Sequence, residues 1–488
     1  MTWLTKSKFM SGRQCLKRLW FEVNQPLSEP MAESMPLLNG RKFDLLVQEM
    51  EPGTVISRES GMPSAISETR RVLHGGSASV LYQPAFKFGD LAVIADILRR
   101  KGAGFQLVEV KASTSVKLEH VPDVAFQTLV LRGAKIPVTS VSIGHIDNTF
   151  VLRKAGDFEG LKVEEDVTSR VEGLLDEIAN DAGQFLRVIN GHEVPDIPMG
   201  SQCTAPYACP FIARCSQEAG EGPEYPVGLL PRGAQVAEAL RAEGFEDLRR
   251  VPAARIENEV HRKVHQATVT GVAYRDPVIA ESLAGYPFPR AYLDFETLSL
   301  SVPEVLGTRP YQQWPFQFSL HIEEAPGKVR HVEFLETEAF GDFERLAEAL
   351  LAALPDNGPV FVYNATLESG VITRLADRYP ILRDKLLGVL SRIVDLLPLT
   401  REGYYHRDMK GSWSIKNVLP TIDPALAYEN LGEIAEGDVA QLAYVELRDP
   451  KTKAARRKEL EAGLKAYCAR DTWGLVVLRR FLAGEGEK

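Results

Sequence analysis

Two stretches of the chain alternate short apolar runs with longer amphipathic ones. In the first stretch, the short runs predict strands, and the runs with apolar residues every three or four positions predict helices. The predicted strands cover 79–83, 91–98, 105–111 and 140–145, and the predicted helices cover 6–21, 64–74, 121–132 and 167–189. Strands interleaved with helices in this way indicate an α/β domain.

From residue 286 the strand-and-helix alternation begins again. The predicted strands cover 290–295, 317–323, 329–334 and 360–363, and the predicted helices cover 340–353, 368–379 and 465–482. Between the two stretches, residues 217–230 are rich in Gly, Pro and Glu, which is typical of a linker. Residues 231–283 then predict a short helical module. We therefore expect an α/β protein in three parts, with an N-terminal domain at 1–222, a linker and helical module at 223–285, and a C-terminal domain at 286–488.

Length, composition and charge fit this division. A chain of 488 residues is too long for one core, and 44% hydrophobic with 25% charged residues is ordinary for a globular protein. The net charge of −9 argues against a protein that coats nucleic acid nonspecifically, but it suits sites rich in carboxylates. No apolar run is long enough to span a bilayer, and the first residues lack a signal-peptide core. We therefore expect no membrane partner and a cytoplasmic location.

The C-terminal domain carries acidic residues at the ends of predicted elements. Asp294 and Glu296 are separated by one residue at the end of a strand, so they share a face. Glu368 begins the helix that follows another buried strand, and Tyr467 and Asp471 lie one turn apart on a helix. Carboxylates grouped in this way can hold the divalent cations of phosphodiester hydrolysis. The alternative is that they cap helices and face solvent.

This order of motifs resembles the DEDD 3′–5′ exonuclease superfamily, and in particular its tyrosine-bearing branch, over roughly residues 286–482. The resemblance implies a ribonuclease-H-like mixed sheet with flanking helices, in which Tyr467 would orient the attacking water. It also implies that two Mg²⁺ or Mn²⁺ ions would be held by four carboxylates: Asp294, Glu296, Glu368 and Asp471. The family usually has Asp where this chain has Glu368. Asp395 stands where such exonucleases often carry a further acidic residue, and a helix cap is its alternative role.

A second set of polar residues lies on predicted strands of the N-terminal domain. Glu109 and Lys111 alternate on one strand face, and a hairpin brings Asp96 beside Glu109. Two carboxylates there can ligate Mg²⁺ or Mn²⁺, while the lysine stabilises charge and positions water. This layout resembles the PD-(D/E)XK nucleases, whose core is restriction-endonuclease-like. Gln127, on the next predicted helix, matches the glutamine of the RecB-like subgroup. Asp44 stands where that subgroup usually has a histidine, and Leu131 where a tyrosine is common.

The five cysteines are placed unevenly, and an odd number argues against a disulfide framework. Cys15 precedes the predicted nuclease core, and Cys203, Cys209 and Cys215 follow it in a Pro-rich loop. This placement resembles the RecB-like nucleases with an iron–sulfur cluster, such as the CRISPR-associated and AddB-type enzymes. The resemblance implies a [4Fe–4S] cluster that ties the domain ends together. A Cys₄ zinc site and four ordinary buried thiols are the alternatives. Cys468 is predicted to be a plain core residue.

As a whole, the chain resembles an uncharacterised bacterial family that fuses these two nuclease domains. Residues 410–420 also resemble that family, and we hypothesise that Lys410, Ser412 and Lys416 contact a substrate strand. His261 and His265 lie four apart in a helix rich in Lys and Arg, which predicts a solvated face.

We expect a metal-dependent nuclease that binds nucleic acid and cuts DNA, at single strands or ends. A 3′–5′ exonuclease site would lie in the C-terminal domain, and a RecB-like site in the N-terminal one. The first alternative is an RNA-processing exonuclease with a vestigial N-terminal domain. The second is a non-catalytic iron–sulfur scaffold that binds nucleic acid.

Overall fold

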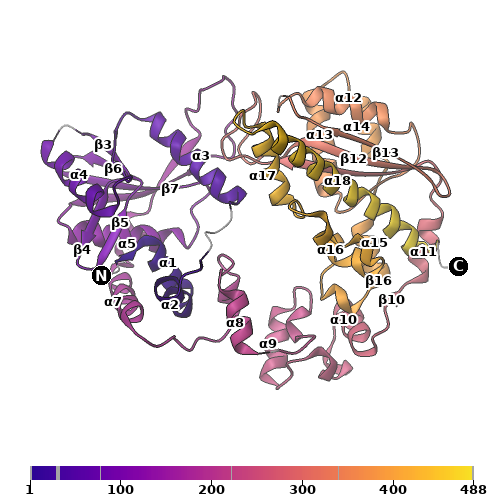
Figure 1. Cartoon of the computed structure of the whole chain (residues 1–488), viewed down its shortest axis with the longest axis horizontal. Helices are drawn as coiled ribbons and strands as arrows, with labels where there is room; N and C mark the ends of the chain where they lie inside the picture. The colour runs from indigo at the N-terminus through magenta and orange to yellow at the C-terminus, as the bar shows by residue number, and fades with distance from the viewer. Residues whose placement is uncertain (1–2, 29–32, 77, 221, 339, 486–488) are drawn as a thin grey trace. The chain divides into compact units, whose positions relative to one another are not determined.

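The computed structural model describes residues 3–28, 33–76, 78–220, 222–338 and 340–485, and it divides the chain into two compact units (Figure 1). Unit 1 comprises residues 1–220 and 300–312, and unit 2 comprises residues 221–299 and 313–488. Each unit combines a mixed β-sheet with helices, so the predicted α/β class is confirmed at that level. The predicted linker and helical module, 223–285, fall within unit 2.

The main sheet of unit 1 has six strands in the order β2-β3-β6-β7-β8-β9. These strands are β2 (Thr54–Val55), β3 (Val80–Tyr82), β6 (Ile97–Lys101), β7 (Gly104–Lys111), β8 (Val138–Ile146) and β9 (Lys162–Asp166). Strand β7 is antiparallel to β6 and parallel to β8, and it is buried along almost its whole length. A smaller sheet joins β1 (Leu4–Thr5), β5 (Leu91–Ile94) and β4 (Ala85–Phe88).

The helices of unit 1 are α1 (Lys6–Gln14), α2 (Leu16–Asn24), α3 (Met35–Met50), α4 (Met62–Gly75), α5 (His120–Gly133), α6 (Thr168–Glu172), α7 (Leu175–Asn190) and α8 (Ile212–Ala219). Several of them pack against these sheets, and α2 packs on α1 and α7. Helix α5 is buried on nearly every side, which explains why its sequence is apolar with little periodicity.

Three elements of unit 1 are broken where the sequence predicts continuity. The helix expected at 6–21 stops at Cys15, whose backbone is extended, and restarts as α2. The strand expected at 91–98 bends at Asp96, so its two halves join different sheets as β5 and β6. The helix expected at 167–189 is divided at Gly173 into α6 and α7. Two of these breaks, at Cys15 and Asp96, fall at predicted site residues.

The second stretch of unit 1, residues 300–312, follows the first strand of the unit 2 sheet. Ser301 donates from its backbone N–H and from its hydroxyl to Asn39 of α3, with both distances 2.8 Å. The Tyr311 hydroxyl donates to the carbonyl of Ala112, immediately after β7. Unit 1 is therefore assembled from residues far apart in the sequence, which the alternation of apolar runs does not reveal.

The sheet of unit 2 has five strands in the order β13-β12-β11-β14-β15. They are β11 (Arg290–Leu298), β12 (Trp314–Ala325), β13 (Lys328–Leu335), β14 (Val360–Val362) and β15 (Ile393–Asp395). Strand β11 is antiparallel to β12 and parallel to β14, so the sheet is mixed. Helix α18 (Ala454–Leu482) packs against β11 and β12, with α12 (Phe343–Ala353), α13 (Thr366–Arg378), α14 (Arg383–Leu390) and α17 (Gly437–Arg448) nearby in the same unit.

The remainder of unit 2 is mostly helical. Its helices are α9 (Ala234–Ala242), α10 (Glu259–Thr270), α11 (Pro277–Ala284), α15 (Leu396–Gly403) and α16 (Ile415–Val418), and a short ribbon pairs β10 (Tyr274–Arg275) with β16 (Tyr404–Tyr405). His261 and His265 of α10 are buried, and their Nε2 atoms lie 2.9 and 2.7 Å from the carbonyls of Pro231 and Val251. The predicted solvated face is therefore wrong, because other segments of the helical module, at Pro231 and Val251, cover these histidines.

Within the described ranges, no helix has both the length and the apolar character needed to cross a bilayer.

A close backbone approach at Gly358 gives a test of the unit 2 core. Gly358 precedes β14 with a φ of +85°, and a Cβ added to it would lie 1.9 Å from the carbonyl oxygen of Pro289. We expect Gly358→Ala to lower the free energy of unfolding by about 1–3 kcal/mol, measured by urea denaturation. Gly388→Ala is the matched control, because a Cβ there meets no atom within 4 Å in helix α14. Equal stability of the two variants would contradict the close approach.

Candidate functional site

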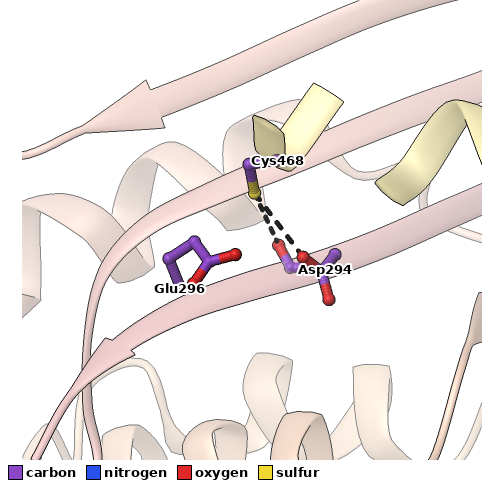
Figure 2. A group of neighbouring side chains, drawn as sticks. All are labelled: Asp294, Glu296 and Cys468. Atoms are coloured by element: carbon purple, nitrogen blue, oxygen red, sulfur yellow. Dashed lines mark hydrogen bonds between the residues drawn. The ribbon is translucent and has the colours of Figure 1, made fainter. Parts of the chain in front are cut away.

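The first candidate site is built on strand β11 of unit 2. Asp294 and Glu296 lie two residues apart on this strand, and helix α18 brings Cys468 over them (Figure 2). One ligand atom from each of these three side chains lies within 4.8 Å of the other two. The Cys468 sulfur is 3.6 Å from Oδ2 of Asp294. Cys468 is fully buried, as predicted for a core residue, but it also belongs to the polar cluster.

The four predicted carboxylates of unit 2 share one electrostatic environment. Burial raises the pKa of Asp294 well above its usual value, and the charges of Asp471, Glu296 and Glu368 raise it further. Burial, with Asp471 and Glu368, raises the pKa of Glu296 in the same way. Burial also raises the pKa of Asp471 to about 6. So much buried negative charge favours either protonation or a bound cation.

Glu368 is delivered to this cluster by the first turn of helix α13. Its side chain is 2% exposed, burial raises its pKa to about 8, and its Oε2 atom has no hydrogen-bond partner among the residues that the structure describes. The turn before α13 is held by Asp395, whose carboxylate accepts hydrogen bonds from the N–H groups of Asn364 and Ala365, both at 2.9 Å. Asp395 also caps α15 through Leu397. Of its two predicted roles, the structure shows capping.

Helix α16 and the segment that follows it add two residues beside the carboxylates: Lys416, which the sequence suggested only for contact with a substrate strand, and Tyr428, which it did not indicate. Tyr428 donates its hydroxyl hydrogen bond to Oδ1 of Asp471. The ammonium of Lys416 lies 5.3 Å from the ring centres of both Tyr428 and Tyr467. Its positive charge opposes the rise in the pKa of Glu296 and Asp471. Tyr428 has no signal in the sequence, because only the fold brings its loop to α18.

The three residues hypothesised to contact a strand do not form one group. Lys416 lies at the carboxylates, but Lys410 lies 3.8 Å above the ring of Tyr225 and donates to the carbonyl of Glu224 at 3.1 Å. Ser412 and Trp413 line a cavity of about 650 Å³ elsewhere in unit 2.

The second candidate site lies at the end of strand β7 in unit 1. Glu109 is 1% exposed, and its carboxylate accepts hydrogen bonds from Lys111 at 2.7 Å and Gln127 at 2.6 Å. Asp96 accepts a hydrogen bond of 2.8 Å from the backbone of Val110, which places it beside Glu109. The structure therefore brings together all four residues predicted for this site.

Two further residues complete this cluster. Lys6, at the start of α1, donates to Glu109 at 2.7 Å. Asp123 of α5 accepts from Lys111 at 2.6 Å and from Gln127 at 3.1 Å. Asp123 precedes Gln127 by one turn on an otherwise apolar helix, a signal that could have identified it. Lys6 has no such signal, because it lies 103 residues before Glu109.

The charges of this second cluster partly offset one another. Burial disfavours ionisation of Glu109, but Lys111 and Lys6 outweigh it and hold the pKa of Glu109 below its usual range. Burial and the Glu109 charge raise the pKa of Asp96 to about 8 and that of Asp44, on α3, to about 6. The pKa of Lys111 is raised by Glu109 and Asp123 despite its burial. The arrangement therefore favours Lys111 as an ammonium that donates hydrogen bonds.

Asp44 joins this cluster through its electrostatic coupling to Glu109. Leu131, at the other position that departs from the RecB-like pattern, is a fully buried core residue of α5.

The four predicted cluster cysteines also converge. Cys15, Cys203, Cys209 and Cys215 line one small cavity of about 20 Å³ and are half-buried free thiols. The N–H of Cys209 donates to the carbonyl of Cys203 at 2.8 Å, which holds the loop closed. Burial raises the pKa of Cys209 and Cys215, so these thiols need a bound metal to ionise at neutral pH. Four thiolates suit either an iron–sulfur cluster or zinc.

Comparison with known proteins gives one family match, which covers part of unit 2 and the 300–312 segment of unit 1, and two distant relatives. A family described as "Domain of unknown function (DUF2779)" matches residues 291–414. An uncharacterised protein of Mycoplasma pneumoniae, a homologue of MG366, is 24% identical over 216 residues, which is 40% of this chain and 32% of the relative. The uncharacterised protein MG366 of Mycoplasma genitalium is 23% identical over 212 residues, with the same shares. The chain thus spans about a third of the length of these relatives.

The raised carboxylate pKa values predict how stability depends on pH. Glu368 and Asp96 have a pKa of about 8 in the folded chain, against 4.5 and 3.8 as ordinary values, so between about pH 6.5 and pH 8 the folded state binds protons that the unfolded state has lost. Stability without metal should therefore fall as pH rises, by about 1 kcal/mol per pH unit for each group. His120 and His321 have a pKa lowered to about 4, so they change the pH dependence of stability only below their usual pKa of 6.5 and leave this range unaffected.

Urea unfolding in EDTA measures this slope. Glu368→Gln should make the decline shallower, because its amide does not titrate, whereas Glu348→Gln on the exposed face of α12 should leave it unchanged. Adding Mn²⁺ should stabilise the wild type more at about pH 8 than at about pH 6.5, because the ion competes with protons. Stability that stays level or rises across this range would contradict the buried clusters.

Proposed function

We propose that this chain is a metal-dependent nuclease that hydrolyses DNA phosphodiester bonds at single strands or ends. A 3′–5′ exonuclease site would lie in unit 2, and a RecB-like PD-(D/E)XK site in unit 1. The observation that carries the proposal is the cluster of buried and half-buried carboxylates Asp294, Glu296, Glu368 and Asp471, because four acidic groups brought together in this way are the ligands that two divalent cations require. The mixed sheet of unit 2, with flanking helices, fits a ribonuclease-H-like fold.

In unit 2, the four carboxylates would hold two Mg²⁺ or Mn²⁺ ions, which supply an activated water and stabilise the leaving 3′ oxygen. The partnerless Oε2 of Glu368 supports this fit, because a buried carboxylate oxygen without a donor suits a metal ligand. Tyr467 would orient the attacking water, and burial, with the charges of Asp471 and Glu296, raises its pKa, so it keeps its proton. Tyr428 would release Asp471 when that carboxylate takes up a metal.

In unit 1, Asp96 and Glu109 would hold the Mg²⁺ or Mn²⁺ ion that supplies the activated water. Lys111 would place its ammonium beside the scissile phosphate and stabilise the charge that develops there. Gln127 and Asp123 hold Lys111 and Glu109 in position through their hydrogen bonds. The donor set therefore fits a metal, provided that Lys6 withdraws from Glu109.

The ion pair between Lys6 and Glu109 is the observation that favours the RNA-processing alternative. Lys6 and Lys111 both occupy Glu109, so a cation at this carboxylate must displace an ammonium. A unit 1 site blocked in this way would leave a single active site in unit 2.

Nuclease assays with end-labelled DNA and RNA test the proposal. With Mg²⁺ or Mn²⁺, we expect DNA cleavage that Asp294→Asn and Lys111→Ala each reduce by at least about 100-fold at their own site, because each removes charge that the transition state needs. Glu348→Gln and Lys154→Ala, on exposed surfaces of the two units, are matched controls and should retain activity. An enzyme that cuts RNA, loses activity with Asp294→Asn and keeps it with Lys111→Ala would favour the alternative. No cleavage of either substrate would refute both.

The cysteine site has an optical test. Protein purified without oxygen should be brown, with the broad visible absorption of a [4Fe–4S] cluster, and Cys203→Ser should remove that absorption because the cluster loses a ligand. Cys468→Ala, which changes the cysteine of unit 2, should keep it. Colourless protein that contains stoichiometric zinc would instead identify a Cys₄ zinc site, and colourless protein without metal would indicate a scaffold of ordinary thiols.

A further inference from the structure

Unit 1 has a further cavity, and none of the candidate site residues line it. Its volume is about 390 Å³, within the range of small-molecule sites, which is about 300–1,000 Å³. It is formed by α4, β4, β6, the start of β7 and the turn after α5. Phe105 lines it and lies four residues before Glu109 on β7, so the cavity is about 13 Å along the strand from the carboxylate cluster.

The rim of this cavity is basic. All its ionisable lining residues are cationic or histidine: Arg70, His74, Lys87, Arg100 and Lys135. These five side chains are exposed, and within the described part of the chain none of them forms an ion pair with an acidic residue. Such a concentration of unpaired positive charge stands out in a chain with a net charge of −9. The rim therefore suits a ligand with more than one negative charge.

The floor of the cavity is apolar and partly aromatic. Ile66, Leu73, Phe86 and Ile136 line it together with Phe105. The guanidinium of Arg100 lies over the Phe105 ring, 5.0 Å from its centre, so its outer face can stack on a flat ring. An apolar floor beside a cationic stacking group matches a nucleobase attached to a phosphate.

We propose that this cavity binds a nucleoside monophosphate, with the base against the apolar floor and Arg100, and the phosphate on Arg70, Lys87 and Lys135. The ligand is either a free nucleotide or the phosphorylated terminal nucleotide of a strand, because both carry the same chemistry. This binding does not depend on catalysis by either carboxylate cluster.

Calorimetric titration of the full chain in EDTA tests the proposal without catalysis. We expect AMP and dTMP to bind, and the matching nucleosides to bind more weakly. The double variant Arg70→Gln, Lys135→Gln should weaken nucleotide binding by at least about 10-fold, because charge-assisted hydrogen bonds to the phosphate are lost. Arg71→Gln is the control, because Arg71 follows Arg70 on α4, is 75% exposed and does not line the cavity. Its affinity should equal that of the wild type. All three changed side chains are exposed, so unchanged melting temperatures should accompany these results.

A 5′-phosphorylated trinucleotide separates the two sources. If the mononucleotides and the trinucleotide both bind at the same Arg70-dependent site, a free nucleotide is supported as the ligand. If the trinucleotide alone binds, the end of a strand is supported. The proposal fails if neither binds, if the double variant binds as tightly as Arg71→Gln, or if dodecanoate binds while the nucleotides do not.

Discussion

Burial of like-charged carboxylates is the constraint on which both sites depend. In unit 2, Asp294, Glu296, Glu368 and Asp471 lie close enough for their charges to oppose one another's ionisation. Such an arrangement costs free energy without a counter-charge, because burial removes the water that would screen it. The surrounding sheet and helix α18 must therefore hold the cluster in place, and a divalent cation would relieve the repulsion.

The two units meet this constraint differently. In unit 1, two ammonium groups and an amide already neutralise or solvate Glu109, so the cluster is stable with its own partners. In unit 2, the positive charge of Lys416 lowers the pKa of Glu296 and Asp471 but does not offset their burial. Within the described chain, Oε2 of Glu368 accepts no hydrogen bond. A bound cation would therefore relieve more repulsion in unit 2, whereas in unit 1 it would first have to displace Lys6.

The sequence indicates the parts of each site that lie on one element, and it misses those that the fold brings in from afar. The spacing of Asp294 and Glu296, and of Glu109 and Lys111, follows from the two-residue repeat of a strand. Most predicted strands and helices overlap observed ones, because apolar positions follow the period of each kind of element. Helices α3 and α17 were not predicted, and the predicted elements are interrupted at Cys15, Asp96 and Gly173. Lys6, Tyr428 and the packing of residues 300–312 into unit 1 depend on long-range contacts, which no local pattern encodes.

The most direct test is the location of bound metal. Crystals grown with Mn²⁺ can be measured at a wavelength where manganese scatters anomalously, which places the ions without reference to activity. We expect anomalous peaks within coordination distance of Asp294, Glu296, Glu368 and Asp471, and a further peak between Asp96 and Glu109. Manganese bound only at exposed carboxylates, with both buried clusters free of it at saturating concentration, would contradict the claim that these carboxylates hold cations.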